Sequence, residues 1–112
     1  MNNLDRKLFV AQRLSAMLLG PLVVIHLGLI LVAVKGGLSG AEILGRTQGS
    51  MVWAAFYLLF VAAAGIHAPI GMRNILNEWT SWSLNVINII CVALFALFLG
   101  IGLRAVIAVV WV

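Results

Sequence analysis

The residues best able to do chemistry lie near the end of a long apolar stretch. The chain there reads His67-Ala-Pro-Ile-Gly71-Met-Arg73, and small residues fill positions 62–65 just before it. An ionisable side chain within a bilayer is costly, so it usually has a partner or a function. Neutral imidazole is a common metal ligand, and small residues let a bulky, flat group approach the backbone. His67 is therefore a candidate ligand, with Gly71 and Arg73 beside it in the sequence.

The composition indicates that these residues lie in a membrane. Hydrophobic residues make up 64% of the 112 residues and charged residues 9%, with a mean hydropathy of +1.18. A soluble globular domain carries about 25% charged residues, so we expect an integral membrane protein with a single domain over residues 1–112. The net charge of +4 does not point to nucleic acid. The basic residues are scattered near segment ends, where they fit lipid headgroups.

Three apolar segments are long enough to cross the membrane, which takes about 20 helical residues. They cover about residues 8–34, 51–72 and 84–110, with a short polar link over 73–83. In the other link, Ser39 and Glu42 have the spacing of a capping box, in which each residue satisfies a free amide of the other. This spacing predicts an interfacial helix over about residues 39–46. The predicted fold is all-α, with three transmembrane helices.

The basic residues also predict an orientation. Arg6, Lys7, Arg13 and Arg73 lie on the side of the N-terminus, and Lys35, Arg46 and Arg104 lie on the other side. By the positive-inside rule, this excess of one places the N-terminus in the cytoplasm. The expected location is the inner (cytoplasmic) membrane of a bacterium or an archaeon.

The depth of each polar side chain follows from a rise of about 1.5 Å per helical residue. His67 lies roughly 8 Å inside the second span. Arg13 lies at nearly the same level in the first span, and Arg73 lies at the same boundary. This grouping fits a haem, with the imidazole on the iron and the guanidinium groups on the propionates. The alternative is a core histidine that is hydrogen-bonded to a neighbouring helix.

The second histidine, His26, lies at a different depth in the membrane. His26 is roughly 27 Å from the N-terminal end of the first span, so one iron cannot bind both histidines of one chain. Its spacing places it on the same helical face as Ser15 and Leu22. Two interpretations stay open: a ligand of a second haem, or an interfacial or hydrogen-bonding histidine. In the third span, Asn85 and Asn88 form a helical pair that we expect to bond to another helix.

The first motif resembles that of a known family. His67-Ala-Pro-Ile-Gly71-Met-Arg73 resembles the His-x-x-x-Gly-x-Arg motif of the cytochrome b membrane-anchor subunits of succinate dehydrogenase and fumarate reductase. Three spans in about 110 residues match the two-subunit anchors of this family. The resemblance implies that His67 is an axial ligand of haem b. It implies that Arg73 holds a propionate or lines the quinone pocket.

A second motif also resembles one of this family, although two of its residues differ. Gln12-Arg13-Leu-Ser15-Ala16 resembles the family's His-Arg-x-Ser-Gly motif, with glutamine in place of histidine and alanine in place of glycine. The resemblance places Arg13 and Ser15 near the haem propionates and the quinone pocket. Phe9 replaces a serine that helps to bind quinone in the family. The spacing from Arg13 to His26 resembles the fourth span of five-helix, two-haem anchors, in which that histidine is a ligand.

The resemblance implies a function in electron transport. The chain would carry electrons between an iron–sulfur subunit and membrane quinone through haem b. It would do so in a complex of the succinate dehydrogenase or fumarate reductase type, which is linked to the tricarboxylic acid cycle. A flavoprotein subunit would perform the dicarboxylate chemistry, so this chain would contribute no catalytic residue. It supplies one imidazole to each of one or two haems. A second membrane-anchor chain must therefore supply the other half of a haem-binding bundle.

Three alternatives remain. The chain could anchor a different flavin and iron–sulfur dehydrogenase, or serve as a haem-free membrane scaffold. It could also be a small transporter subunit. The predicted spans contain no Asp or Glu, and proton-coupled transporters typically carry such carboxylates within the membrane. The transporter is therefore disfavoured.

Overall fold

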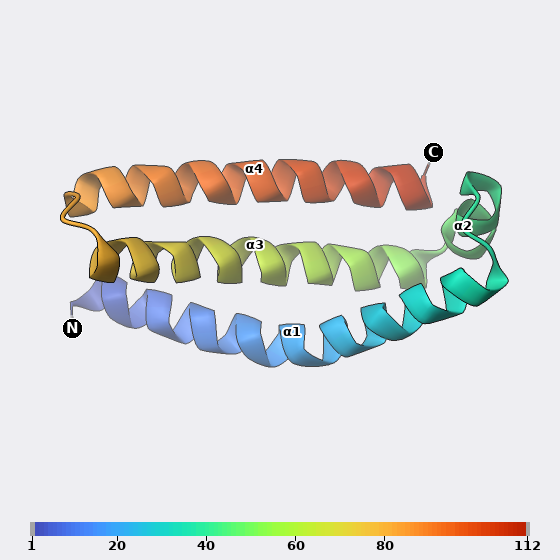
Figure 1. The fold of residues 1–112 in the computed structure, drawn as a ribbon, viewed down its shortest axis with the longest axis horizontal. Coiled ribbons are helices and arrows are strands. Elements are labelled where there is room, and N and C mark those ends of the chain that lie inside the picture. The colour runs from blue at the N-terminus through green and yellow to red at the C-terminus, as the bar shows by residue number, and fades with distance from the viewer. Residues whose placement is uncertain (1, 112) are drawn as a thin grey trace.

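The computed structural model describes residues 2–111, and Figure 1 shows their helices. These are α1 (Asn3–Gly36), α2 (Gly40–Thr47), α3 (Met51–Trp79) and α4 (Leu84–Val110). Helices α1, α3 and α4 are each long and apolar enough to cross a membrane. Helix α3 lies between α1 and α4 and runs antiparallel to both (Figure 1). The prediction of an all-α protein with three transmembrane helices is confirmed.

Two helices extend beyond the predicted apolar segments. Helix α1 begins at Asn3, because the side chain of Asn2 accepts a hydrogen bond of 2.8 Å from the Asp5 amide. Helix α3 continues past Met72 to Trp79, so the link to α4 is residues 80–83. The helix therefore includes part of the polar segment over residues 73–83. Polarity alone does not end a helix when its side chains face water or find partners.

The short helix α2 confirms the predicted capping box and closes one end of the bundle. The Ser39 side chain accepts from the Glu42 amide, and the Glu42 carboxylate accepts from the Ser39 amide. At the end of α2, the Thr47 hydroxyl donates to the Val109 carbonyl at 2.6 Å. The Gly49 amide donates to the Val110 carbonyl at 2.7 Å. Carbonyls in the last helical turn have no partner within the helix, so this segment satisfies two of them in α4.

Helix α3 packs directly against α4, and the buried cluster between them lies near the start of α3 and the end of α4. Ala54 of α3 forms a buried cluster with Val106 and Val110 of α4. Further along, a Cβ atom on Gly102 would lie 2.5 Å from a methyl group of Val61. Small residues of this kind let membrane helices approach closely. The position of α3 beside α4 is therefore set by direct contact at a glycine.

Helix α1 covers the opposite side of α3. Ser15 and Leu22 are buried, and His26 is half-buried, so the face predicted from their spacing does point inward. Pro21 lies within the helix, and α1 is visibly bowed in Figure 1. Proline removes a backbone hydrogen bond and crowds the preceding turn. Ser15 contacts α3 before Pro21, and His26 contacts it after Pro21.

Candidate functional site

His67 meets Ser15 where α3 packs against α1. The distance from Ser15 Oγ to His67 Nδ1 is 3.3 Å, and Ser15 Oγ also donates to the Gln12 carbonyl at 2.9 Å. Ser15 is 4% exposed and His67 is half-buried. Within residues 2–111, the Nε2 atom of His67 has no hydrogen-bond partner. The contact satisfies Nδ1, as a core histidine would require, and leaves Nε2 available to a ligand.

Small residues of α3 flank His67. A Cβ atom on Gly71, one turn further along, would lie 3.4 Å from the Gln12 side-chain nitrogen, so α1 passes close to α3 at this point. In the other direction, Ala64 and Gly65 help to line a hollow of about 380 Å³ between α3 and α4. A Cβ atom on Gly65 would meet no atom within 4 Å. This hollow lies on the side of α3 that faces α4, and His67 does not line it.

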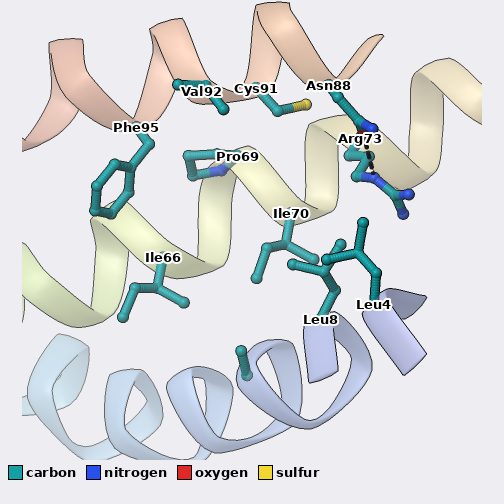
Figure 2. A pocket seen from close by; sticks show the side chains of 11 residues that line it. Leu4, Leu8, Ile66, Pro69, Ile70, Arg73, Asn88, Cys91, Val92 and Phe95 are labelled. Carbon is teal, nitrogen blue, oxygen red and sulfur yellow. Dashed lines mark hydrogen bonds between the residues drawn. The ribbon is translucent and has the colours of Figure 1, made fainter. Parts of the chain in front are cut away.

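Arg73 is buried and joins three helices. Its side chain donates from Nε to Asn88 Oδ1 of α4 at 2.8 Å, and Nη2 forms an ion pair with Asp5 of α1 at 3.2 Å. Figure 2 shows Arg73 reaching Asn88 across the gap between their helices. The expectation that the pair bonds to another helix is confirmed for Asn88, whereas Asn85 is exposed and its side chain has no hydrogen bond among the described residues. Asp5 was not predicted as a partner, because nothing in the sequence shows which turn of α1 lies beside the end of α3.

Arg13 lies at the same end of the molecule but is exposed. Its guanidinium group stacks over the Phe9 ring, 5.1 Å from the ring centroid. Together with Gln12 and Arg73, it lines a polar pocket of about 470 Å³. The Oε1 atom of Gln12 is buried and has no hydrogen-bond partner among the described residues. The structure thus brings the two arginines to one pocket, close in sequence to Ser15 and His67.

His26 lies elsewhere, in a cluster of aromatic residues. Its ring packs edge-on against Phe60 at 5.2 Å and against Tyr57 at 6.3 Å between centroids. It also lines a cavity of about 290 Å³ with Gly102 of α4. Phe60 precedes His67 by seven residues of α3, which corresponds to about 10 Å along the helix axis. The structure does not bring the two histidines together.

An apolar pocket that the sequence did not reveal lies among α1, α3 and α4. Its volume is about 510 Å³ (Figure 2). Leu8 of α1, Ile70 of α3 and Phe95 of α4 contribute to its apolar wall, and Arg73 and Asn88 also line it. Such a pocket can hold an apolar molecule that carries a polar group. Sequence reasoning missed it because its walls come from three segments whose relative register the sequence does not show.

Three helices of this length and hydropathy define an integral membrane protein. A family model described as succinate dehydrogenase/fumarate reductase transmembrane subunit matches residues 1–103. The chain belongs to this family and is therefore a membrane-anchor subunit, as the motifs around His67 and Arg13 indicated. No curated protein and no solved structure gave a match.

Proposed function

We propose that this anchor subunit binds haem b and that His67 supplies one axial ligand to the iron. The observation that carries the proposal is the contact between Ser15 and His67. It engages Nδ1, and an imidazole with its proton on Nδ1 has the Nε2 lone pair open to a metal, which is the usual arrangement of an iron-bound imidazole. When bound, the haem supplies a one-electron carrier between the iron–sulfur subunit and the membrane quinone.

A second membrane chain supplies the opposing ligand in this proposal. The two histidines of this chain lie at different levels, so neither can serve as the second ligand for the other's iron. Helix α3 contacts α1 on one side and α4 on the other (Figure 1). A homologous chain or a second copy would therefore complete the bundle. Flavoprotein and iron–sulfur subunits would bind at the N-terminal side, which we expect to be cytoplasmic.

The two arginines have different parts in this function. Arg13 is exposed and carries no ion pair among the described residues, so it is the better candidate for a haem propionate. Arg73 already has Asp5 as a counter-charge and lines the apolar pocket with Asn88. We assign Arg73 to the quinone pocket, where a ring and an isoprenoid chain need an apolar wall and a polar group.

His26 is proposed as the ligand of a second haem. An intramembrane histidine needs a partner, and neither ring nitrogen of His26 has a hydrogen bond to another residue in the described part of the chain. The adjacent cavity is lined partly by Gly102 and Ala105, which occupy little space. The support for this second site is the unpartnered imidazole and the adjacent cavity, because His26 has no partner equivalent to Ser15.

The test is haem quantitation in the purified complex, with the copurified subunits identified by mass spectrometry. We expect a b-type α band in the reduced-minus-oxidised spectrum. A His67→Ala variant should lack at least one haem equivalent. The matched control is Ile70→Ala, which loosens the same helix contact one turn away without removing an imidazole. Absence of the α band in the native complex, or full haem in His67→Ala, would contradict the proposal.

A further inference from the structure

We propose that Ser15 is a positioning residue for His67, fixing the proton of the imidazole on Nδ1 so that Nε2 is free to bind iron. This inference rests on the proposed role of His67 as a haem ligand. It differs from the role implied by the family motif, which places Ser15 near the propionates and the quinone. In the structure, Ser15 acts through the histidine.

The chemistry of the groups around Ser15 assigns the donors and the acceptors. A serine hydroxyl has one proton, and a carbonyl can only accept. The contact of 2.9 Å from Ser15 Oγ to the Gln12 carbonyl therefore uses the serine proton. The contact of 3.3 Å to His67 Nδ1 is then a hydrogen bond only if Nδ1 donates to Oγ. A neutral imidazole with its proton on Nδ1 carries a lone pair on Nε2.

The surroundings of Ser15 hold its hydroxyl in place. Ser15 is 4% exposed, so water does not compete for its hydroxyl. The bond to Gln12 spans one turn of α1, and the close approach of Gly71 to the Gln12 side chain holds that turn against α3. Hydrogen bonds are stronger in an environment of low dielectric constant. The hydroxyl therefore holds one orientation, and the imidazole holds one tautomer.

The hydrogen bond at Nδ1 would affect a metal bound at Nε2. A partner that accepts the second N–H of an imidazole ligand orients the ring and raises the basicity of the ligating nitrogen. A more basic ligand favours ferric over ferrous iron. Loss of the Ser15 hydroxyl should therefore weaken haem binding, by about ten- to hundredfold from the behaviour of comparable partners. It should also shift the haem midpoint potential to a more positive value.

The experiment compares the native complex with Ser15→Ala, Ser15→Thr and Leu22→Ala. Threonine keeps a hydroxyl that can donate to a carbonyl one turn back. Leu22→Ala removes a buried side chain on the same face of α1, about 10 Å along the helix from Ser15. The readouts are haem per complex and the midpoint potential in a redox titration. Ser15→Cys serves as a second variant if Ser15→Ala does not assemble, since a thiol is only a weak donor and acceptor.

The inference predicts lower haem affinity and a more positive potential in Ser15→Ala or Ser15→Cys. It predicts recovery in Ser15→Thr and native values in Leu22→Ala. A potential in Ser15→Ala equal to the native one would overturn the inference and leave the haem proposal intact. Equal shifts in Ser15→Ala and Leu22→Ala would also overturn it, because packing would then explain both. A native complex without haem would overturn the proposed function and this inference together.

Discussion

Arg73 on α3 forms an ion pair with Asp5 near the start of α1, with Nη2 and Oδ1 3.2 Å apart. The arginine side chain is 9% exposed and the aspartate side chain 37%. A buried guanidinium group needs a partner, and here the chain supplies its own carboxylate. The arginine of the family motif therefore holds three helices together at one end, whatever molecule it also contacts.

Asp5→Ala should destabilise the subunit. Arg73 would keep its bond to Asn88 but lose its counter-charge while remaining buried. We expect a cost of about 1.5–3 kcal/mol, the range for a hydrogen bond to a charged group, towards the lower end because Asp5 is partly exposed. Thermal unfolding of the purified complex measures this. Glu78→Ala, which removes an exposed carboxylate of α3, should have little effect; equal loss in both variants would contradict the role of the ion pair.

Gly102→Ala should weaken the packing of α3 against α4. The new methyl group would overlap Val61, and overpacking of this kind costs about 1–3 kcal/mol. The matched control is Gly100→Ala, because a Cβ atom at Gly100 would meet nothing within 4 Å. A double variant with Val61→Ala should recover stability in the same unfolding assay. Tolerance of Gly102→Ala at native stability would show that the two helices can separate without cost.

His26→Ala should halve the haem content if both histidines are ligands. Its removal also takes away an edge-on contact with Phe60, so a control must keep the aromatic packing. His26→Phe provides this control, since it restores a ring and lacks a ligating nitrogen. Both variants should lose one haem equivalent by haemochrome assay. Full haem content in His26→Phe would leave His67 as the single ligand of this chain.

The stability of the short helix α2 should depend on pH, because Glu42 caps it. The hydrogen bond from the Ser39 side chain, the Ser39 amide and the charge of Arg46 together hold the pKa of Glu42 below its usual value. A lowered pKa means that the folded state favours the carboxylate. The contribution of Glu42 is therefore present above the pKa of a free glutamate and is lost as the pH falls through the lowered value.

Ser39→Ala should move the pKa of Glu42 back towards its usual value, as measured by an NMR titration of the carboxyl carbon. Ser50→Ala is the control, because Ser50 caps α3 and does not contact Glu42. An unchanged titration of Glu42 in Ser39→Ala would show that the capping box does not control this carboxylate.

Local patterns predicted the local structure. The spacing of Ser39 and Glu42 predicted α2, and hydropathy predicted the three spans, because both depend on residues close together in the chain. The estimated depth placed Arg13 near His67, and Ser15 follows Arg13 by two residues. A contact between Ser15 and His67 was thus predictable from the sequence. The pairing of Arg73 with Asp5 was not, because it depends on how α1 is placed along α3.

The proline in α1 has a consequence for the two histidine levels. Pro21 has no amide proton, so one carbonyl in the preceding turn loses its helical partner, and α1 bows at its middle (Figure 1). Ser15 lies before this point and His26 after it. The contacts that α1 makes with α3 at Ser15 and at His26 therefore lie on opposite sides of the bend.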